Sequence, residues 1–209
     1  MHHLRFVTLL AVSLCSPLFG AGFTMEKAAA PEGAPEAAAA MVAAEGVTVK
    51  NGDTVVAQYW GRKDAFEGSP SAGFGIRYGT IPEGAFLALV HFPEEGHDFR
   101  EQGIPAGWYT LRYALHPEDG NHMGVAPSRD FSVLSPAAQD DELAKNYKFA
   151  DLVELTKKVG NPHPTVERIE LPEGSDGPNL WEDDYGHWVL DLPIAGEVVG
   201  IVVYGHSEE

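Results

Sequence analysis

"GIPAGWYTLRYALHP", residues 103–117, determines the fold class that we expect for this chain. Pro105 and Gly107 are turn residues placed directly before an uninterrupted run of side chains that favour β-strands. Successive side chains of a strand point to opposite faces of its sheet. The more apolar face, which we predict to lie in the core, carries Tyr109, Leu111, Tyr113 and Leu115. The opposite face carries Trp108, Thr110, Arg112 and Ala114.

Short apolar runs separated by turn residues recur along the rest of the chain. The strongest hairpin signal is Asn51-Gly52, which stands between two alternating runs in VTVKNGDTVVAQYW, residues 47–60. Further strands are expected in 84–92, 128–136, 165–171, 187–193 and 197–206. Seven to ten short strands predict a mainly β fold, an antiparallel β-sandwich. We expect Trp188 and Leu190 to line the same interior as the apolar face of the strand in residues 103–117.

One stretch has a helical pattern instead. Residues 137–160, AAQDDELAKNYKFADLVELTKKVG, contain no glycine or proline before Gly160, and are acidic early and lysine-rich late. This charge order complements a helix dipole, and the glycine is a typical helix stop. We therefore expect one helical crossover at about 138–159, with an apolar stripe formed by Phe149, Leu152, Val153 and Thr156.

The first 45 residues differ from the strand-rich remainder. Residues 1–23 combine a weakly basic start, an apolar run and small residues, which is typical of a secretory signal peptide. Residues 24–45 are rich in Ala, Pro and Glu and predict a linker or a short helix that has Pro35 in its first turn. The β-sandwich domain would then occupy 46–209, in the periplasm or outside the cell.

The net charge and the cysteine content limit which partners and which kinds of site we expect. The formal net charge is −17, which disfavours nucleic acid and anionic lipid surfaces and favours cations or basic partners. The single cysteine, Cys15, lies in the expected signal peptide, so the mature chain would have no disulfide and no thiolate site. A lipoprotein would use Cys15, but the bulky Leu14 precedes it. Beyond the first 23 residues, no apolar segment is long enough for a membrane span.

The segment from Ile104 to Phe131, IPAGWYTLRYALHPEDGNHMGVAPSRDF, resembles a family of uncharacterised secreted β-rich proteins from environmental bacteria. In that family a Pro-x-Gly-x-Tyr-Thr-Leu strand leads into an Asp-Gly-Asn-His-Met-Gly loop and then a strand with Asp-Phe. The likeness extends from about Gly46 to the final IVVYG and covers most of the mature chain. It implies secretion and a single β-rich domain, and it brings no assigned binding or catalytic residues.

The loop HPEDGNHMG, residues 116–124, is the first candidate site. Imidazole nitrogens with a thioether are a ligand set that suits copper, and an added carboxylate from Asp119 or Glu118 would suit a harder ion. The candidate metal ligands are His116, Asp119, His122 and Met123. The alternative, which we favour, is a turn of Asp, Gly and Asn in which the methionine packs back against the sheet. The other histidines could contribute only if the fold brings them together.

The second candidate site is WEDDYGHW, residues 181–188. Three carboxylates beside aromatic rings could bind calcium or a sugar. The candidate ligand-binding residues are Trp181, Glu182, Asp183 and Asp184. The alternative, again preferred, is a solvated turn whose tryptophans are buried.

Common catalytic motifs are missing from the sequence. It contains no Gly-x-Ser-x-Gly, no His-Glu-x-x-His and no phosphate-binding glycine loop. The favoured hypothesis is an exported, non-enzymatic binding or interaction module without a cofactor. Its rivals are a periplasmic copper- or zinc-binding protein that uses the 116–123 loop, and a hydrolase whose carboxylates and histidines are dispersed along the chain.

Overall fold

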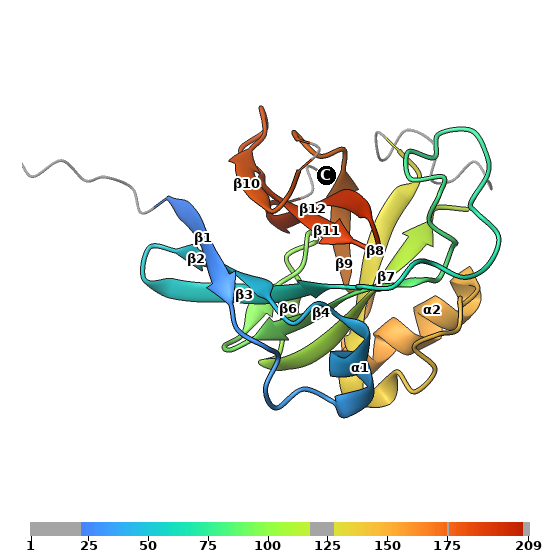
Figure 1. The fold of residues 1–209 in the computed structure, drawn as a ribbon, viewed down its shortest axis with the longest axis horizontal. Coiled ribbons are helices and arrows are strands. Elements are labelled where there is room, and N and C mark those ends of the chain that lie inside the picture. The colour runs from blue at the N-terminus through green and yellow to red at the C-terminus, as the bar shows by residue number, and fades with distance from the viewer. Residues whose placement is uncertain (1–21, 118–127, 175, 207–209) are drawn as a thin grey trace, which may run out of the picture.

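The computed structural model describes residues 22–117, 128–174 and 176–206. Within these residues ten strands form one antiparallel sheet, ordered β1-β2-β3-β4-β7-β8-β9-β12-β11-β10 (Figure 1). Their bounds are Phe23–Ala28, Gly46–Asn51, Thr54–Gly61, Phe86–Phe92, Gly107–Leu115, Asp130–Pro136, Val166–Glu170, Glu197–Tyr204, Trp188–Ile194 and Asn179–Glu182, given in that order. A separate hairpin pairs β5, Gly96–His97, with β6, Gly103–Ile104.

The main sheet curls into a nearly closed barrel. The end of β3 meets the end of β11, where Ala195 N donates to Arg62 O at 2.7 Å. At Gly61 a Cβ atom would lie only 2.0 Å from Pro193 O, so this close approach requires glycine. The mainly β, antiparallel prediction is confirmed. The division into two sheets that a sandwich requires is not confirmed, because β9 and β12 pair and join the two halves.

The barrel interior holds the main hydrophobic core. Tyr109, Leu111, Tyr113 and Leu115 of β7 lie in it together with Leu190 of β11, as predicted. Trp188 is only half buried and stacks on Phe23, with 5.4 Å between ring centroids. The prediction for Trp188 was therefore wrong, because it lies where β1 approaches β11 at the edge of the barrel.

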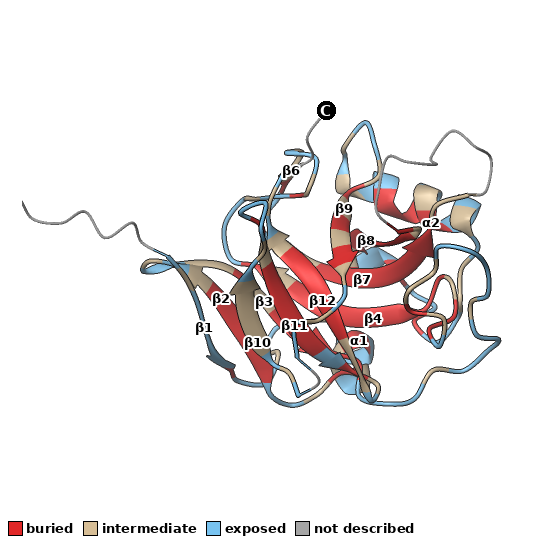
Figure 2. Cartoon of the chain, turned by 90° about the horizontal axis from the view of Figure 1, so that it is seen from above, coloured by how far each residue is buried: buried red, intermediate tan, exposed pale blue. Residues whose placement is uncertain are grey.

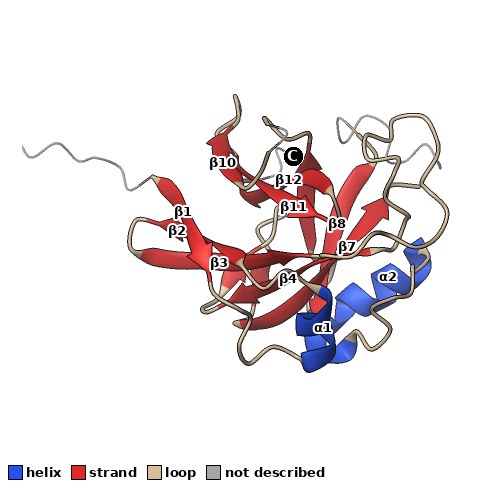
Figure 3. Ribbon diagram, in the orientation of Figure 1, coloured by secondary structure: helices blue, strands red, loops and turns tan. Residues whose placement is uncertain are grey.

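The outer face of β7 is buried as well, which the alternation did not predict. Thr110, Arg112 and Ala114 are fully buried there. Two short helices, α1 (Glu36–Met41) and α2 (Phe149–Thr156), lie on this side of the sheet (Figure 3). Figure 2 accordingly shows β4 and β7 mostly buried, whereas much of β1 is exposed.

The connection between β8 and β9 carries the expected helical segment, but only part of it is helical. It consists of η1 (Ala137–Gln139), an irregular stretch, α2 and η2 (Lys157–Val159), and it ends at Gly160 with φ of 104°. Leu155 is buried in addition to the predicted Leu152 and Thr156, whereas Phe149 and Val153 are only half buried. Among the described residues no helix is both long and apolar enough to cross a membrane.

Residues 24–45 are not simply a linker. Residues 24–28 belong to β1, which pairs with β2 over its whole length, so the β domain begins before residue 46. The short helix is present as α1, preceded by Pro35, and its Ala38 is buried. The sequence of β1 resembles that of a linker because four of its six residues are exposed, as residues of an edge strand often are.

Candidate functional site

A cavity of about 510 Å³ opens at one end of the barrel. Its walls come from the start of β1, the β2–β3 turn, the β5–β6 hairpin, β9 and the end of β12. The apolar lining residues are Phe23, Val55, Val56, Phe92, Phe99, Val202, Val203 and Tyr204. The acidic ones are Glu94, Glu95, Asp98, Glu101 and Glu167, and two histidines, His97 and His206, also line it. A volume of this size suits a small organic molecule.

Glu167 of β9 is the most unusual residue of this cavity. Its side chain belongs to the inward face of the strand and is only 4% exposed. The phenol of Tyr59, on β3, donates a hydrogen bond to Glu167 Oε1 at 2.9 Å. Oε2 has no hydrogen-bond partner within the described part of the chain. A buried polar atom without a partner is rare in proteins, and this one belongs to a residue that lines a cavity.

The surroundings of Glu167 favour its protonated form. Burial raises its pKa to about 8 from an ordinary 4.5; the Tyr59 hydrogen bond opposes the shift, and the charge of Asp98 adds to it. Burial and the neighbouring Glu167 also raise the pKa of Tyr59 well above its usual value, so the phenol keeps its proton. A strongly shifted carboxyl in a cavity is a typical feature of a functional site.

The β5–β6 hairpin that walls the cavity is fixed by Asp98. Asp98 Oδ1 accepts the backbone N–H of Arg100 at 2.9 Å and of Gln102 at 2.8 Å. Asp98 Oδ2 accepts the Gln102 side-chain amide and, across to β9, the backbone N–H of Val166. This turn holds Glu101 at a positive φ of 60°, which is unfavourable for a residue other than glycine. The hairpin therefore presents Glu101 to the cavity from a well-anchored turn.

A second buried charged group lies on the outer face of the sheet and, unlike Glu167, makes all of its hydrogen bonds. Arg112 of β7 donates from Nε and Nη2 to the two oxygens of Asp140, at 2.7 and 2.8 Å. Its other three donor hydrogens reach the carbonyl oxygens of Gly84, Lys145 and Glu142. The guanidinium therefore uses all five of its donors. It ties the irregular stretch after η1 to the barrel and has a structural role.

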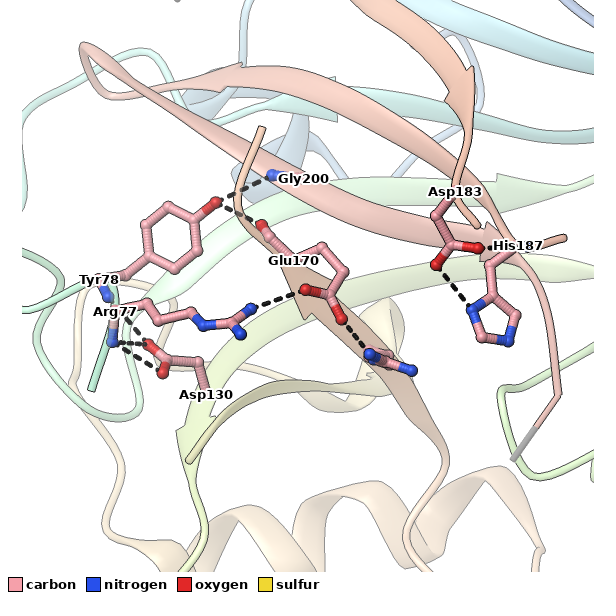
Figure 4. Close-up of polar contacts among 8 residues, drawn as sticks. Arg77, Tyr78, Asp130, Glu170, Asp183, His187 and Gly200 are labelled. Carbon is pink, nitrogen blue, oxygen red and sulfur yellow. Dashed lines mark hydrogen bonds and ion pairs between the residues drawn. The ribbon is translucent and has the colours of Figure 1, made fainter. Parts of the chain in front are cut away.

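Polar contacts at the junction of β9 and β12 are also structural. The Tyr78 phenol donates to Glu170 O at 2.6 Å and accepts from Gly200 N at 3.1 Å, so it bridges the two strands (Figure 4). The Asp130 carboxylate accepts the backbone N–H groups of Arg77 and Tyr78. The Tyr78 bridge therefore adds two hydrogen bonds at a junction where β9 and β12 are paired over only two residue positions, and Asp130 holds the segment that carries Tyr78.

Asp183 and His187 form a compact turn before β11 (Figure 4). Asp183 Oδ2 lies 2.9 Å from His187 Nδ1, and Oδ1 accepts the backbone N–H groups of Tyr185 and His187. Burial by itself would raise the pKa of Asp183, but these hydrogen bonds and the imidazole lower it below the usual value. The other ring nitrogen, His187 Nε2, lies 3.3 Å from His206 O, so both ring nitrogens have partners within the protein.

The predicted ligand-binding residues around this turn are not gathered at the cavity. The Trp181 indole donates to Asp191 Oδ1 at 2.9 Å, and Asp183 closes the turn. Glu182 and Asp184 are exposed to solvent. None of the four lines the cavity described above. Their role in ligand binding stays a prediction, and the geometry of Trp181 and Asp183 agrees with a structural turn.

The predicted metal ligands fall mostly outside the described residues. Asp119, His122 and Met123 lie in 118–127. His116 is described, and its ring stacks on Phe131 with 4.3 Å between centroids. In the parts of the chain that the structure describes, no group of three or more histidine, cysteine or carboxylate side chains is arranged to hold a metal ion. A copper or zinc site in the 116–123 loop stays a prediction.

Comparisons with known proteins found no match to this chain among family models, curated proteins or solved structures. The resemblance of residues 104–131 to secreted β-rich proteins therefore also stays a prediction. What the site can bind therefore follows from the chemistry of its own residues.

Sequence reasoning did not single out Glu167 or Tyr59. Both lie in predicted strands, and the sequence carries a signal for the first. In TVERIEL, alternation places Glu167 on the same face as Ile169, opposite Arg168. An acidic residue on the apolar face of a strand is unusual and marks a buried carboxyl. The tyrosine partner, 108 positions away, could be found only from the fold.

Proposed function

We propose that this protein is a non-enzymatic binding module that takes up a small amphipathic molecule in the cavity at the barrel mouth. The observation that carries the proposal is Glu167, whose buried Oε2 has no partner among the described residues although it lines that cavity. A buried carboxyl with one oxygen bonded and the other unbonded is stabilised when a ligand supplies the missing partner.

The rest of the lining supports an amphipathic ligand. The aromatic and valine side chains offer an apolar surface, while the carboxylates at the hairpin offer hydrogen-bond acceptors. Apolar walls with a few placed polar groups are typical of small-molecule sites. The barrel frame around the cavity is well packed, which suits a preformed site that loses little conformational entropy on binding.

The proposal is tested by blocking the cavity. Thr54 is exposed at the start of β3 and lines the cavity, so Thr54→Trp should fill the entrance without disturbing the core. Thr24→Trp is the matched control, because Thr24 is an exposed strand residue that does not line the cavity. In a thermal-shift screen of small amphipathic molecules, ligands should stabilise the wild type and Thr24→Trp but not Thr54→Trp. Equal stabilisation of all three proteins would refute the proposed site.

A second candidate function, hydrolysis, is favoured by the presence of Glu167 and two histidines around one cavity. A carboxyl that titrates at about 8 can act as a general acid or base, and His97 and His206 line the same cavity. The test is a panel of chromogenic esters and glycosides assayed with the wild type and Glu167→Gln. Turnover that the substitution abolishes would establish an enzyme, whereas equal background rates would exclude Glu167 as its acid or base for those substrates.

We also propose that the module acts in the periplasm or outside the cell. The support is the pattern of residues 1–23, and the acidic composition suits an exported protein that attracts cations or basic partners. Intact-mass analysis of the exported protein should show a start near residues 20–24. A soluble cytoplasmic product that retains Met1 would contradict this proposal.

A further inference from the structure

We infer that the ligand is a small organic cation, an amine on an apolar body, whose ammonium group replaces the proton of Glu167. This inference rests on the proposed function, because it names the ligand class of the same cavity. Three properties of the cavity carry it: the charge of its lining, the geometry of Glu167, and its aromatic walls.

The charge of the lining is of one sign. Five carboxyl residues line the cavity, and among the described lining residues there is no lysine or arginine. Asp98 already accepts four hydrogen bonds from its own hairpin and from β9. The lining carboxyl groups that can still accept a hydrogen bond from a ligand are therefore those of Glu94, Glu95, Glu101 and Glu167. Such a lining repels carboxylate, phosphate and sulfate ligands and attracts cations.

The geometry of Glu167 suits a single donor group. Tyr59 holds Oε1, so the carboxyl has a fixed orientation, and the buried Oε2 is the oxygen without a partner in the described chain. An ammonium group on Oε2 makes a charge-assisted hydrogen bond, which is roughly twice as strong as a bond between neutral groups. A bare metal ion would need several ligands at once, and the described residues provide no such group.

The aromatic walls distinguish an organic cation from a simple one. The rings of Phe23, Phe92, Phe99 and Tyr204 line the cavity. Aromatic faces bind apolar bodies and also attract cations through their quadrupoles. An amine that carries an aromatic or aliphatic body would use both properties.

Binding has a balanced proton exchange. Because burial raises the pKa of Glu167 to about 8, we expect its carboxyl to hold one proton in the empty cavity at pH 7. The incoming R–NH₃⁺ forms its bond to the carboxylate, and that proton leaves to solvent. Among the described residues, Tyr59 from β3 and Asp98 from the β5–β6 hairpin act directly on the pKa of Glu167. The other titratable groups that line the cavity are Glu94, Glu95, Glu101, His97 and His206. Since burial raises the pKa of Glu167 to about 8, the affinity for the amine should rise with pH up to that value and then level off.

The experiment uses three head groups on two bodies: the amine, the alcohol and the carboxylic acid of a 2-phenylethyl and of a butyl chain. Binding to the full chain is measured by isothermal titration calorimetry at pH 7 in buffers of different ionisation enthalpy. We expect an amine to bind at least about tenfold more tightly than its matched alcohol and acid, with release of up to one proton. Glu167→Gln should abolish the proton release and weaken amine binding.

The matched control is Glu32→Gln, an exposed glutamate that does not line the cavity. It should leave amine binding unchanged. If Glu182→Gln weakens binding while Glu167→Gln does not, the ligand site lies at residues 181–184 and the inference is wrong. Alcohols that bind as tightly as amines without proton release, and that Thr54→Trp blocks, would overturn the cation inference while the proposed function stands. If Thr54→Trp binds every compound as well as the wild type, or if nothing binds, both fail.

Discussion

Arg112 and Glu167 are both buried in the same sheet, yet their surroundings differ in one decisive respect. Arg112, on the outer face, meets Asp140 and three carbonyl oxygens and has no donor left over. Glu167, on the inner face, has one hydrogen bond and one oxygen without a partner in the described chain. Both side chains are buried, and the decisive difference between them is how completely their hydrogen bonds are made.

The comparison shows how a structural polar cluster differs from a ligand site. A buried charge with all its hydrogen bonds made needs nothing else, and its removal costs stability. A carboxyl with an unbonded oxygen on a cavity destabilises the empty protein, and a ligand can relieve that cost. Four substitutions test this difference, and each affects the free energy of unfolding measured by urea denaturation.

The largest effect is expected for Asp140→Asn. The substitution keeps the side-chain shape but leaves the Arg112 guanidinium buried without its counter-charge, which should cost about 3–5 kcal/mol. Asp141→Asn, next along the chain and exposed, is the control and should change the stability by less than about 0.5 kcal/mol. Similar small effects for both would mean that the ion pair is not a structural element.

Thr110→Val should cause the next largest loss of stability. The Thr110 hydroxyl donates to Asp140 Oδ2 at 2.7 Å, and both residues are buried. Loss of a hydrogen bond to a charged group costs about 1.5–3 kcal/mol. A variant as stable as the wild type would show that the remaining donors satisfy Asp140 without this hydroxyl.

The pH dependence of stability should be altered by Glu167→Gln. Because the folded pKa of Glu167 is raised to about 8 from 4.5, the folded state holds a proton that the unfolded state has lost between these values. This one group should therefore lower the free energy of unfolding by about 1.4 kcal/mol per pH unit as pH rises through that window. Glutamine cannot titrate, so the variant gains stability relative to the wild type from pH 5 to pH 8. A difference that stays constant with pH would contradict the raised pKa.

The smallest effect is expected for Tyr59→Phe. It removes the hydroxyl that donates to Glu167 Oε1, a bond to a group that is uncharged at neutral pH, and should cost about 0.5–1.5 kcal/mol. A loss larger than that of Thr110→Val would reverse the comparison, because it would indicate that Glu167 carries its charge in the folded protein.

Much of the fold could be predicted from alternation and turn residues. The hairpin at Asn51-Gly52 is present as β2 and β3, and the apolar face of β7 lies inside. Barrel closure could not be predicted, because strands of a barrel and of a sandwich have the same period of two. It depends on the pairing of β9 with β12 and on the contact of Gly61 with Pro193, which join residues far apart in the sequence.

The candidate site was less predictable, for two physical reasons. The outer face of β7 became a buried polar cluster because the connection after β8 folds over Arg112, and no local pattern indicates this. The cavity collects residues from five separated segments, so motifs near the chain's histidines and tryptophans did not point to it. The acidic residue on the apolar face of β9 was the one local sign of the site.

The protonation state of Glu167 in the empty protein is the central claim, and infrared difference spectroscopy measures it directly. Spectra of the wild type minus Glu167→Gln isolate the signal of this carboxyl as pH is raised. We expect a carboxylic-acid C=O band at neutral pH that converts to carboxylate with a midpoint of about 8, and that is lost at pH 7 when a bound amine replaces the proton. A carboxylate signal already present at pH 6, with a midpoint close to the ordinary 4.5, would contradict the account.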